Sequence, residues 1–167
     1  MAKAADQEQW KGAVEARLPS TPASAAWPHI ATFCALHRYV PSIDVCERAA
    51  GAEDGQPGCV RYCASFAPGT EEVANWAREE LLELDDLARR VVYAIVESSM
   101  GFGRYVASIT VLPEEGQGCR LVWAFECEPV QGWSRDGLLG YLDGEVKGMA
   151  ARIEEAAAVS AGGDVAA

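Results

Sequence analysis

Six segments between residues 43 and 129 have the alternation and composition of strands, and turn-rich breaks separate them. The predicted strands are residues 43–50, 58–66, 70–84, 89–98, 104–112 and 119–129. The breaks, of which Ala67-Pro68-Gly69 is typical, consist largely of residues that favour turns. Because connections of this kind link hairpins, the sequence predicts an antiparallel sheet.

The part of the chain before this series predicts one more strand and two short helices. Residues 10–18 alternate as a strand, and a Pro-rich stretch ends it. Thr21 is the predicted N-cap of a helix over residues 23–33. Pro28 is expected to kink this helix or to separate it from the next turn, and residues 34–39 form a second short helix.

The final segment predicts one long helix over residues 134–159, capped by Ser134. Its apolar residues recur at helical spacing and form one stripe, Leu138, Leu142, Val146, Met149 and Ile153. A row of glycines is expected on the opposite, solvent-facing side, Gly140, Gly144 and Gly148. The order of elements therefore predicts an α+β fold, in which a seven-stranded curved antiparallel sheet wraps the C-terminal helix and leaves an internal cavity.

The length of 167 residues fits a single domain over residues 10–159, with residues 1–9 and 160–167 as flexible tails. The net charge is −11, with 14 Lys and Arg against 25 Asp and Glu, which argues against binding to nucleic acid or to anionic membranes. No run of 18 apolar residues is present, so no membrane span is predicted.

The six cysteines are predicted to be free thiols in a cytoplasmic, reducing compartment, because the N-terminus has no secretory signal pattern. No C-x-x-C pair occurs, and neither His29 nor His37 lies near Cys59 and Cys63 to complete a zinc site. We therefore expect no metal, no cofactor and a monomeric protein.

The hairpin over residues 57–82 carries the candidate functional pair. Side chains of a strand alternate between its faces, so Arg61 and Glu79 lie on the odd-numbered faces of the two arms. If both faces point inward, one Arg and one Glu meet inside an apolar concave surface, which is typical of a catalytic or ligand-binding site. The alternative is that one or both lie on a solvated face of the sheet. The cavity lining predicted from this register is Cys59, Arg61, Cys63, Asn75, Glu79, Tyr93, Ile95, Tyr105, Ala107, Ile109, Trp123 and Phe125, roofed by Leu138, Leu142, Val146 and Met149.

Several fragments resemble a known family: Trp10-Lys-Gly-Ala-Val-Glu-Ala, residues 33–46, Gly58-Cys-Val-Arg-Tyr and Trp76-Ala-Arg-Glu-Glu-Leu. They resemble the lachrymatory factor synthase-like plant proteins of the Bet v 1/START superfamily, near the polyketide cyclase and abscisic acid receptor branches. The resemblance extends from Trp10 to about residue 155 and implies the helix-grip fold.

The resemblance also implies an activity and a set of site residues. In the onion enzyme of this family a sulfenic acid is rearranged to a thial S-oxide by internal relocation of a proton. The family's catalytic Arg and Glu fall on Arg61 and Glu79, and two pocket tyrosines fall on Tyr93 and Tyr105. A neighbouring aromatic position is Phe102, which has no hydroxyl, and the turn over residues 66–69 differs from that of the onion enzyme. The full set of expected substrate-binding residues is Tyr93, Tyr105, Trp123, Cys63, Asn75, Phe102 and Leu142.

Three functions follow as hypotheses. The first is an isomerase-type enzyme in which Arg61 holds the substrate oxygen and Glu79 moves a proton. The second is a non-catalytic binding or transport protein for a small hydrophobic or sulfur-containing molecule, and the third is an interaction protein that uses the glycine row. An abscisic acid receptor is disfavoured, because that branch uses a buried lysine and no Lys occurs between Lys11 and Lys147.

Overall fold

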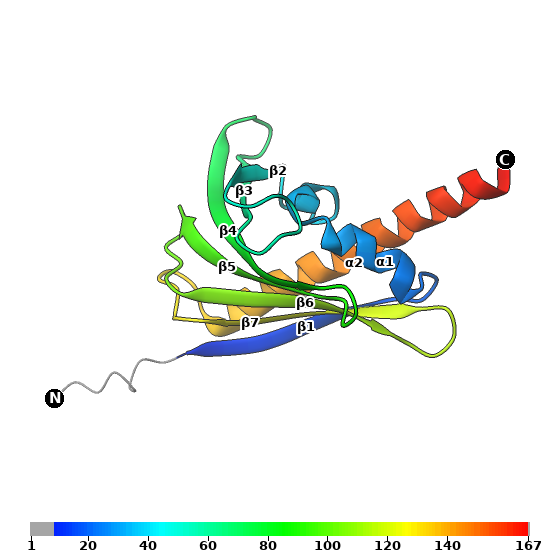
Figure 1. Ribbon diagram of the computed structural model, residues 1–167. Coiled ribbons are helices and arrows are strands. Elements are labelled where there is room, and N and C mark those ends of the chain that lie inside the picture. The colour runs from blue at the N-terminus through cyan, green and yellow to red at the C-terminus, as the bar shows by residue number, and fades with distance from the viewer. Residues whose placement is uncertain (1–8, 167) are drawn as a thin grey trace.

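The computed structural model describes residues 9–166 and contains one seven-stranded antiparallel sheet. Its strand order is β1-β7-β6-β5-β4-β3-β2, so the first strand pairs with the last and the others follow as hairpins (Figure 1). The strands are β1 (Trp10–Leu18), β2 (Val45–Ala50), β3 (Val60–Phe66), β4 (Val73–Asp85), β5 (Arg90–Ser98), β6 (Tyr105–Pro113) and β7 (Cys119–Cys127). The predicted antiparallel sheet is confirmed.

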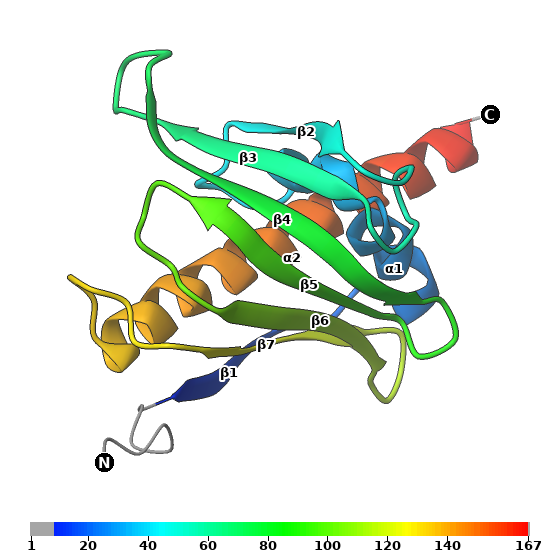
Figure 2. The ribbon, with the colours of Figure 1, turned by 60° about the vertical axis from the view of Figure 1, so that its left-hand side comes forward.

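Three helical segments lie on the concave side of this sheet: α1 (Ala23–Ala31), the 3-10 helix η2 (Phe33–Arg38) and α2 (Arg135–Ala166). Figure 1 shows α2 crossing the concave face with α1 beside it, and Figure 2 shows the strands passing in front of the long helix. A curved sheet that wraps one long C-terminal helix is the helix-grip arrangement that the sequence predicts.

The start of α1 differs from the prediction. Pro22 occupies the cap position, and no side chain caps the helix. The hydroxyl of Thr21 instead donates to the carboxylate of Glu154 on α2, with Oγ1 3.3 Å from Oε2. The prediction of a Thr21 cap is therefore wrong, because a tertiary contact takes the side chain that local spacing assigned to the helix end. Two short helical segments are present as predicted, but α1 continues through Pro28 and separates from η2 only at Thr32.

The long helix begins as predicted and ends later. Ser134 caps it, since its Oγ accepts a hydrogen bond from the backbone N–H of Gly137 at 2.9 Å. The helix continues beyond Val159 to Ala166, through a stretch for which the sequence analysis expects a flexible tail. Alanine has the highest helix propensity, and residues 156–158 are all alanine, which favours continuation. The tail predicted for residues 1–9 lies outside the described residues except at its last position.

The row of glycines on α2 does not face solvent throughout. Gly140 and Gly144 face open space, as predicted. A Cβ at Gly148 would collide with the ring of Pro41, in the segment between η2 and β2. Gly148 therefore allows this segment to approach the helix, and the prediction of a solvent-facing residue there is wrong.

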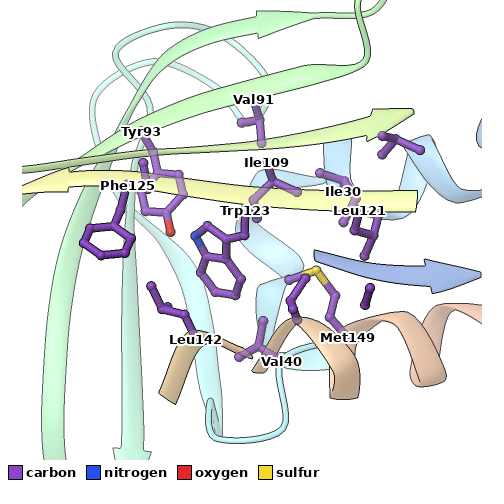
Figure 3. Close-up of a cluster of buried hydrophobic side chains, with 14 of the residues drawn as sticks. Ile30, Val40, Val91, Tyr93, Ile109, Leu121, Trp123, Phe125, Leu142 and Met149 are labelled. Atoms are coloured by element: carbon purple, nitrogen blue, oxygen red, sulfur yellow. The ribbon is translucent and has the colours of Figure 1, made fainter. Parts of the chain in front are cut away.

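The core fills the space between the concave face of the sheet and the helices (Figure 3). Side chains from the central strands, from α1 and from α2 meet there, among them Ile30, Val91, Ile109, Leu121, Trp123 and Met149. The odd-numbered residues of β7, of β5 up to Ile95 and of β6 up to Val111 point inward, as the alternation predicts. Glu97 is an exception, because the pairing of β4 with β5 shifts next to it and Glu97 pairs with Arg78 at the surface. A bulge in β4 between Leu81 and Glu83 shifts the register, so that Leu84 packs against the core beyond it.

The described part of the chain shows neither a membrane-spanning helix nor a cluster of metal ligands. None of its helices combines the length and the apolar character that a bilayer span requires. Within residues 9–160, no three His, Cys, Asp or Glu side chains are grouped so that they could hold a metal ion.

Candidate functional site

A cavity of about 280 Å³ lies between the sheet and α2. Its walls are mostly apolar and come from β3 to β7, η2, the segment before β2 and the first half of α2. Glu79 and all seven residues expected to bind substrate line it: Cys63, Asn75, Tyr93, Phe102, Tyr105, Trp123 and Leu142. The structure therefore brings together side chains that come from strands far apart in the sequence.

Of the other residues predicted to line the cavity, Ile95 and Leu138 do so, and the rest lie behind its wall. Those that do not are packed in the surrounding core: Cys59, Arg61, Ala107, Ile109, Phe125, Val146 and Met149. The expectation that these seven line the cavity is wrong, because period-two alternation tells which side of the sheet a residue faces but not whether a neighbour covers it.

Arg61 and Glu79 form a buried ion pair. They are direct cross-strand partners on β3 and β4, and their residue exposures are 3% and 9%. Arg61 Nε donates to Glu79 Oε1 at 2.8 Å. Nη2 lies 2.7 Å from the same oxygen, a charge–charge contact without the alignment of a second hydrogen bond. Both residues therefore lie on the same inward face, the alternative that the alternation favours for a functional site, and the observed register places the two charges side by side.

Aromatic rings enclose the guanidinium of Arg61. Its Cζ lies 3.9 Å from the centre of the Phe33 ring and 4.8 Å from that of Tyr93. Its Nη1 donates to the backbone oxygen of Phe33 at 2.7 Å. Burial is the largest effect and lowers the pKa of Arg61, but the carboxylate of Glu79, together with Cys63, Tyr93 and Cys46, outweighs it and raises the pKa above its ordinary value. Arg61 is therefore a permanent cation that acts on the cavity through Glu79.

Glu79 has one oxygen turned to Arg61 and one available to a ligand. Oε1 accepts from Arg61 and lies 4.0 Å from the thiol sulfur of Cys63. Among the residues that the structure describes, none donates a hydrogen bond to Oε2, and the side chain keeps 12% of its exposure. Because Glu79 lines the cavity, its second oxygen can accept a proton from a bound molecule.

Three further polar groups reach the cavity from the strands. Burial raises the pKa of Tyr93 and of Tyr105, and the Glu79 carboxylate adds to both effects, so both phenols stay protonated at neutral pH. The indole N–H of Trp123 is buried without a hydrogen-bond partner in the described chain. Figure 3 shows the Trp123 nitrogen and the Tyr93 hydroxyl pointing toward each other above Leu142.

Two thiols stand beside the ion pair. Cys46 and Cys63 are cross-strand partners on β2 and β3, with their sulfur atoms 3.6 Å apart. The hydrogen bond from Cys63 lowers the pKa of Cys46 to about 7, against the opposing effect of burial and with support from Arg61. The same bond, together with burial, raises the pKa of Cys63. A second pair, Cys34 and Cys59, also has its sulfur atoms 3.6 Å apart.

Several residues that line the cavity from α2, from just before α2 and from the segment before β2 were not predicted from the sequence. Glu145 and Tyr141 line the cavity from α2, and Trp133 lines it from just before that helix. The signal for Glu145 was present, since it lies seven residues after Leu138, two helical turns along the same face. Ile43 was assigned to the predicted strand over residues 43–50, but β2 begins only at Val45. Ile43 and Val40 lie in the irregular segment before it, for which strand or helix spacing predicts no lining residue.

The fold has many solved counterparts. Major latex-like protein 151 from Panax ginseng is 19% identical, covers 88% of this chain and 96% of its own, and has a TM-score of 0.68. The aromatase/cyclase Zhui from Streptomyces sp. R1128 is 15% identical over 90% of this chain and 94% of its own, with a TM-score of 0.69. The protein XoxI from Bacillus cereus is 19% identical over 88% and 94%, with a TM-score of 0.68. At these identities the likeness concerns the fold alone.

The sequence itself carries the family relationship. The model of the family described as "Polyketide cyclase / dehydrase and lipid transport" matches residues 9–158, which is nearly the whole chain. This match includes every strand and the part of α2 that covers the cavity. The chain belongs to the polyketide cyclase/dehydrase and lipid transport family.

Proposed function

We propose that the protein is a small-molecule enzyme that rearranges an apolar substrate by proton transfer, as lachrymatory factor synthase does. The observation that carries the proposal is the Glu79 carboxylate, which is ion-paired through one oxygen and faces an apolar cavity with the other. In such a site a carboxylate takes a proton from one substrate atom and returns it to another. For a sulfenic acid, the proton leaves the S–O–H oxygen and arrives at carbon, so the product is an isomer and no co-reactant is needed.

In this proposal Arg61 is a positioning residue. Its guanidinium is covered by Phe33 and Tyr93, so it does not hold the substrate oxygen directly. It fixes the orientation of the Glu79 side chain through the hydrogen bond from its Nε. The hydroxyls of Tyr93 and Tyr105 are protonated and line the cavity, and they orient the substrate oxygen instead.

The second candidate function is a non-catalytic carrier of a small hydrophobic molecule. The mostly apolar lining of the cavity favours it, and the family description includes lipid transport. In a carrier, Glu79 is only a polar anchor, and its oxygen needs no proton-bearing atom beside it.

Glu79→Gln separates the enzyme from the carrier. The amide keeps the size and a hydrogen-bonding oxygen but accepts no proton, so turnover of a sulfenic acid generated in place is expected to fall at least about a hundredfold. Affinity for an unreactive analogue is expected to stay within a few-fold. Turnover is followed by the thial S-oxide formed, and affinity by calorimetry.

Glu80→Gln is the matched control for this test. Glu80 is the next residue on β4, so its side chain faces the other side of the sheet, and no loss of turnover is expected. Equal turnover in Glu79→Gln and the unmutated protein would rule out the proton relay. If the unmutated protein binds the analogue but turns over no tautomerisable substrate, the carrier is the function.

We also infer a reducing, cytoplasmic location and a monomeric state. All six cysteines are free thiols, and even the nearest pairs have sulfur atoms 3.6 Å apart. Free thiols in such close pairs favour a reducing environment.

A further inference from the structure

The cavity holds a second carboxylate, Glu145 of α2, to which the proposed proton relay assigns no part. Glu145 is only 9% exposed and lines the cavity from the helix side, opposite the sheet. Its one hydrogen bond comes from the backbone N–H of Ser42, at a long 3.4 Å to Oε2. Within residues 9–160 no Lys or Arg forms an ion pair with Glu145, whereas the charge of Glu79 is balanced by Arg61.

The two carboxylates act on the same part of the cavity. Tyr141 also lines the cavity, and its pKa is raised, mainly by burial. The hydrogen bond with Ser42 lowers this pKa, whereas Glu145 and Glu79 both raise it. Arg61 pairs with Glu79, and no Lys or Arg of the described residues pairs with Glu145. A buried carboxylate with no counter-charge and only one long hydrogen bond is unfavourable unless a further donor reaches it.

A second polar group in the cavity is only weakly satisfied. The indole N–H of Trp123, a residue that is 5% exposed, points toward the hydroxyl of Tyr93 (Figure 3) without the alignment of a hydrogen bond. The cavity therefore offers a carboxylate on α2 whose one hydrogen bond is the long contact from Ser42, and a donor on β7 without a well-aligned acceptor. A purely hydrocarbon ligand would add a partner for neither group.

We propose that the cavity takes an aromatic or otherwise apolar molecule that carries a hydrogen-bond donor, either a hydroxyl or a protonated amine, and that the Glu145 carboxylate accepts this donor. The inference rests on the cavity being the ligand site, as in the proposed function, and adds the chemical class of the ligand. The Ser42 contact does not replace the ligand, because it uses only one of several lone pairs and leaves Oε1 free.

Three probes with the same ring system test this assignment: naphthalene, 2-naphthol and 2-naphthylmethylamine. A hydrogen bond to a charged group supports at least about a tenfold preference, so one or both donor-bearing probes are expected to bind the unmutated protein that much more tightly than naphthalene. In Glu145→Gln the preference is expected to shrink to about threefold or less, because a neutral amide is the weaker acceptor. Binding is measured by calorimetry or by quenching of tryptophan fluorescence.

Glu145→Gln keeps an oxygen for the N–H of Ser42, so the contact between the helix and that segment is retained. Asp143→Asn is the matched control on the same helix, since Asp143 pairs with Lys147 at the surface and does not line the cavity. Naphthalene affinity is expected to be the same in all three proteins. Comparison of 2-naphthol with 2-naphthylmethylamine tells whether the donor is a hydroxyl or a cation.

The outcomes are separate from those of the proton-relay test. Equal affinity of the unmutated protein for the three probes overturns the role of Glu145, and so does a preference that persists in Glu145→Gln. If naphthalene binds and either of these results is found, the cavity is still the ligand site. Only the requirement that the ligand carries a hydrogen-bond donor is then overturned. Failure of all three probes to bind overturns both the ligand class and the cavity itself.

Discussion

Arg61 is the residue that links the sheet to the helical segment before it. Its guanidinium bonds both to Glu79 on β4 and to the backbone oxygen of Phe33 at the start of η2. The ring of Phe33 covers the same guanidinium. Loss of Arg61 would leave the Glu79 carboxylate buried without a counter-charge, which costs far more than loss of an exposed pair.

Arg61→Ala is therefore expected to lower the free energy of unfolding by about 3–5 kcal/mol. Arg61→Lys keeps the charge but not the planar fork that reaches both partners, so an intermediate loss is expected. Arg78→Ala is the control, because Arg78 forms an exposed cross-strand pair with Glu97 and its loss is expected to cost about 0–1 kcal/mol. The measurement is urea denaturation, and similar losses in Arg61→Ala and Arg78→Ala would contradict the buried ion pair.

The long helix α2 combines glycines with opposite surroundings. Gly144 faces open space, while Gly148 lies against Pro41. The contact at Gly148 holds the segment between η2 and β2 close to the helix. In the same region Ser42 bonds to Tyr141, with their hydroxyl oxygens 2.8 Å apart, and Ser65 donates to the Ser42 carbonyl at 2.6 Å. The segment between η2 and β2 thus fixes two side chains that line the cavity, Tyr141 and Ser65.

Gly144→Ala and Gly148→Ala are expected to change stability in opposite directions. At Gly144 the new methyl group meets no atom, so the better helix propensity of alanine raises the free energy of unfolding by up to about 1 kcal/mol. At Gly148 the methyl group collides with a rigid proline ring, so the protein is expected to be destabilised despite the same gain in propensity. Thermal unfolding of both variants checks this, and equal stabilisation by both would contradict the close approach of Pro41.

The molecule as a whole contains six cysteines and no cross-link in the described chain. Four of them stand in two close pairs, Cys34 with Cys59 and Cys46 with Cys63. Their sulfur separation of 3.6 Å far exceeds a disulfide bond of about 2.05 Å. Stability therefore comes from the core between the sheet and α2.

A thiol titration of the denatured, unreduced protein is expected to count six groups. Reduction before denaturation should leave both the count and the thermal midpoint unchanged, since no disulfide contributes to stability. A count of four or fewer in protein prepared without oxidant would contradict the free thiols and the reducing compartment inferred from them.

Local patterns determined the elements and the faces of the strands. Period-two alternation on both sides of Pro68-Gly69 was sufficient to place Arg61 and Glu79 on matching faces of the two arms. Their direct pairing also depends on a loop that extends to β4 at Val73 and on a bulge between Ser65 and Phe66, which the alternation did not specify. The stripe on the last helix likewise identified the side that packs against the sheet, including Leu138 and Leu142 at the cavity. The order of these elements was enough to predict the helix-grip fold.

The tertiary structure decided which inward-facing residues reach the cavity. Alternation placed Arg61 on the concave side, but Phe33 comes from a segment distant in the sequence and covers it. Helical spacing placed Glu145 on the same face as Leu138, but only the packing of α2 against the sheet left it uncovered at the cavity. Whether Arg61 is covered and whether Glu145 is exposed to the cavity depend on how three or more segments pack together. The spacing of residues along one segment carries no information on that packing.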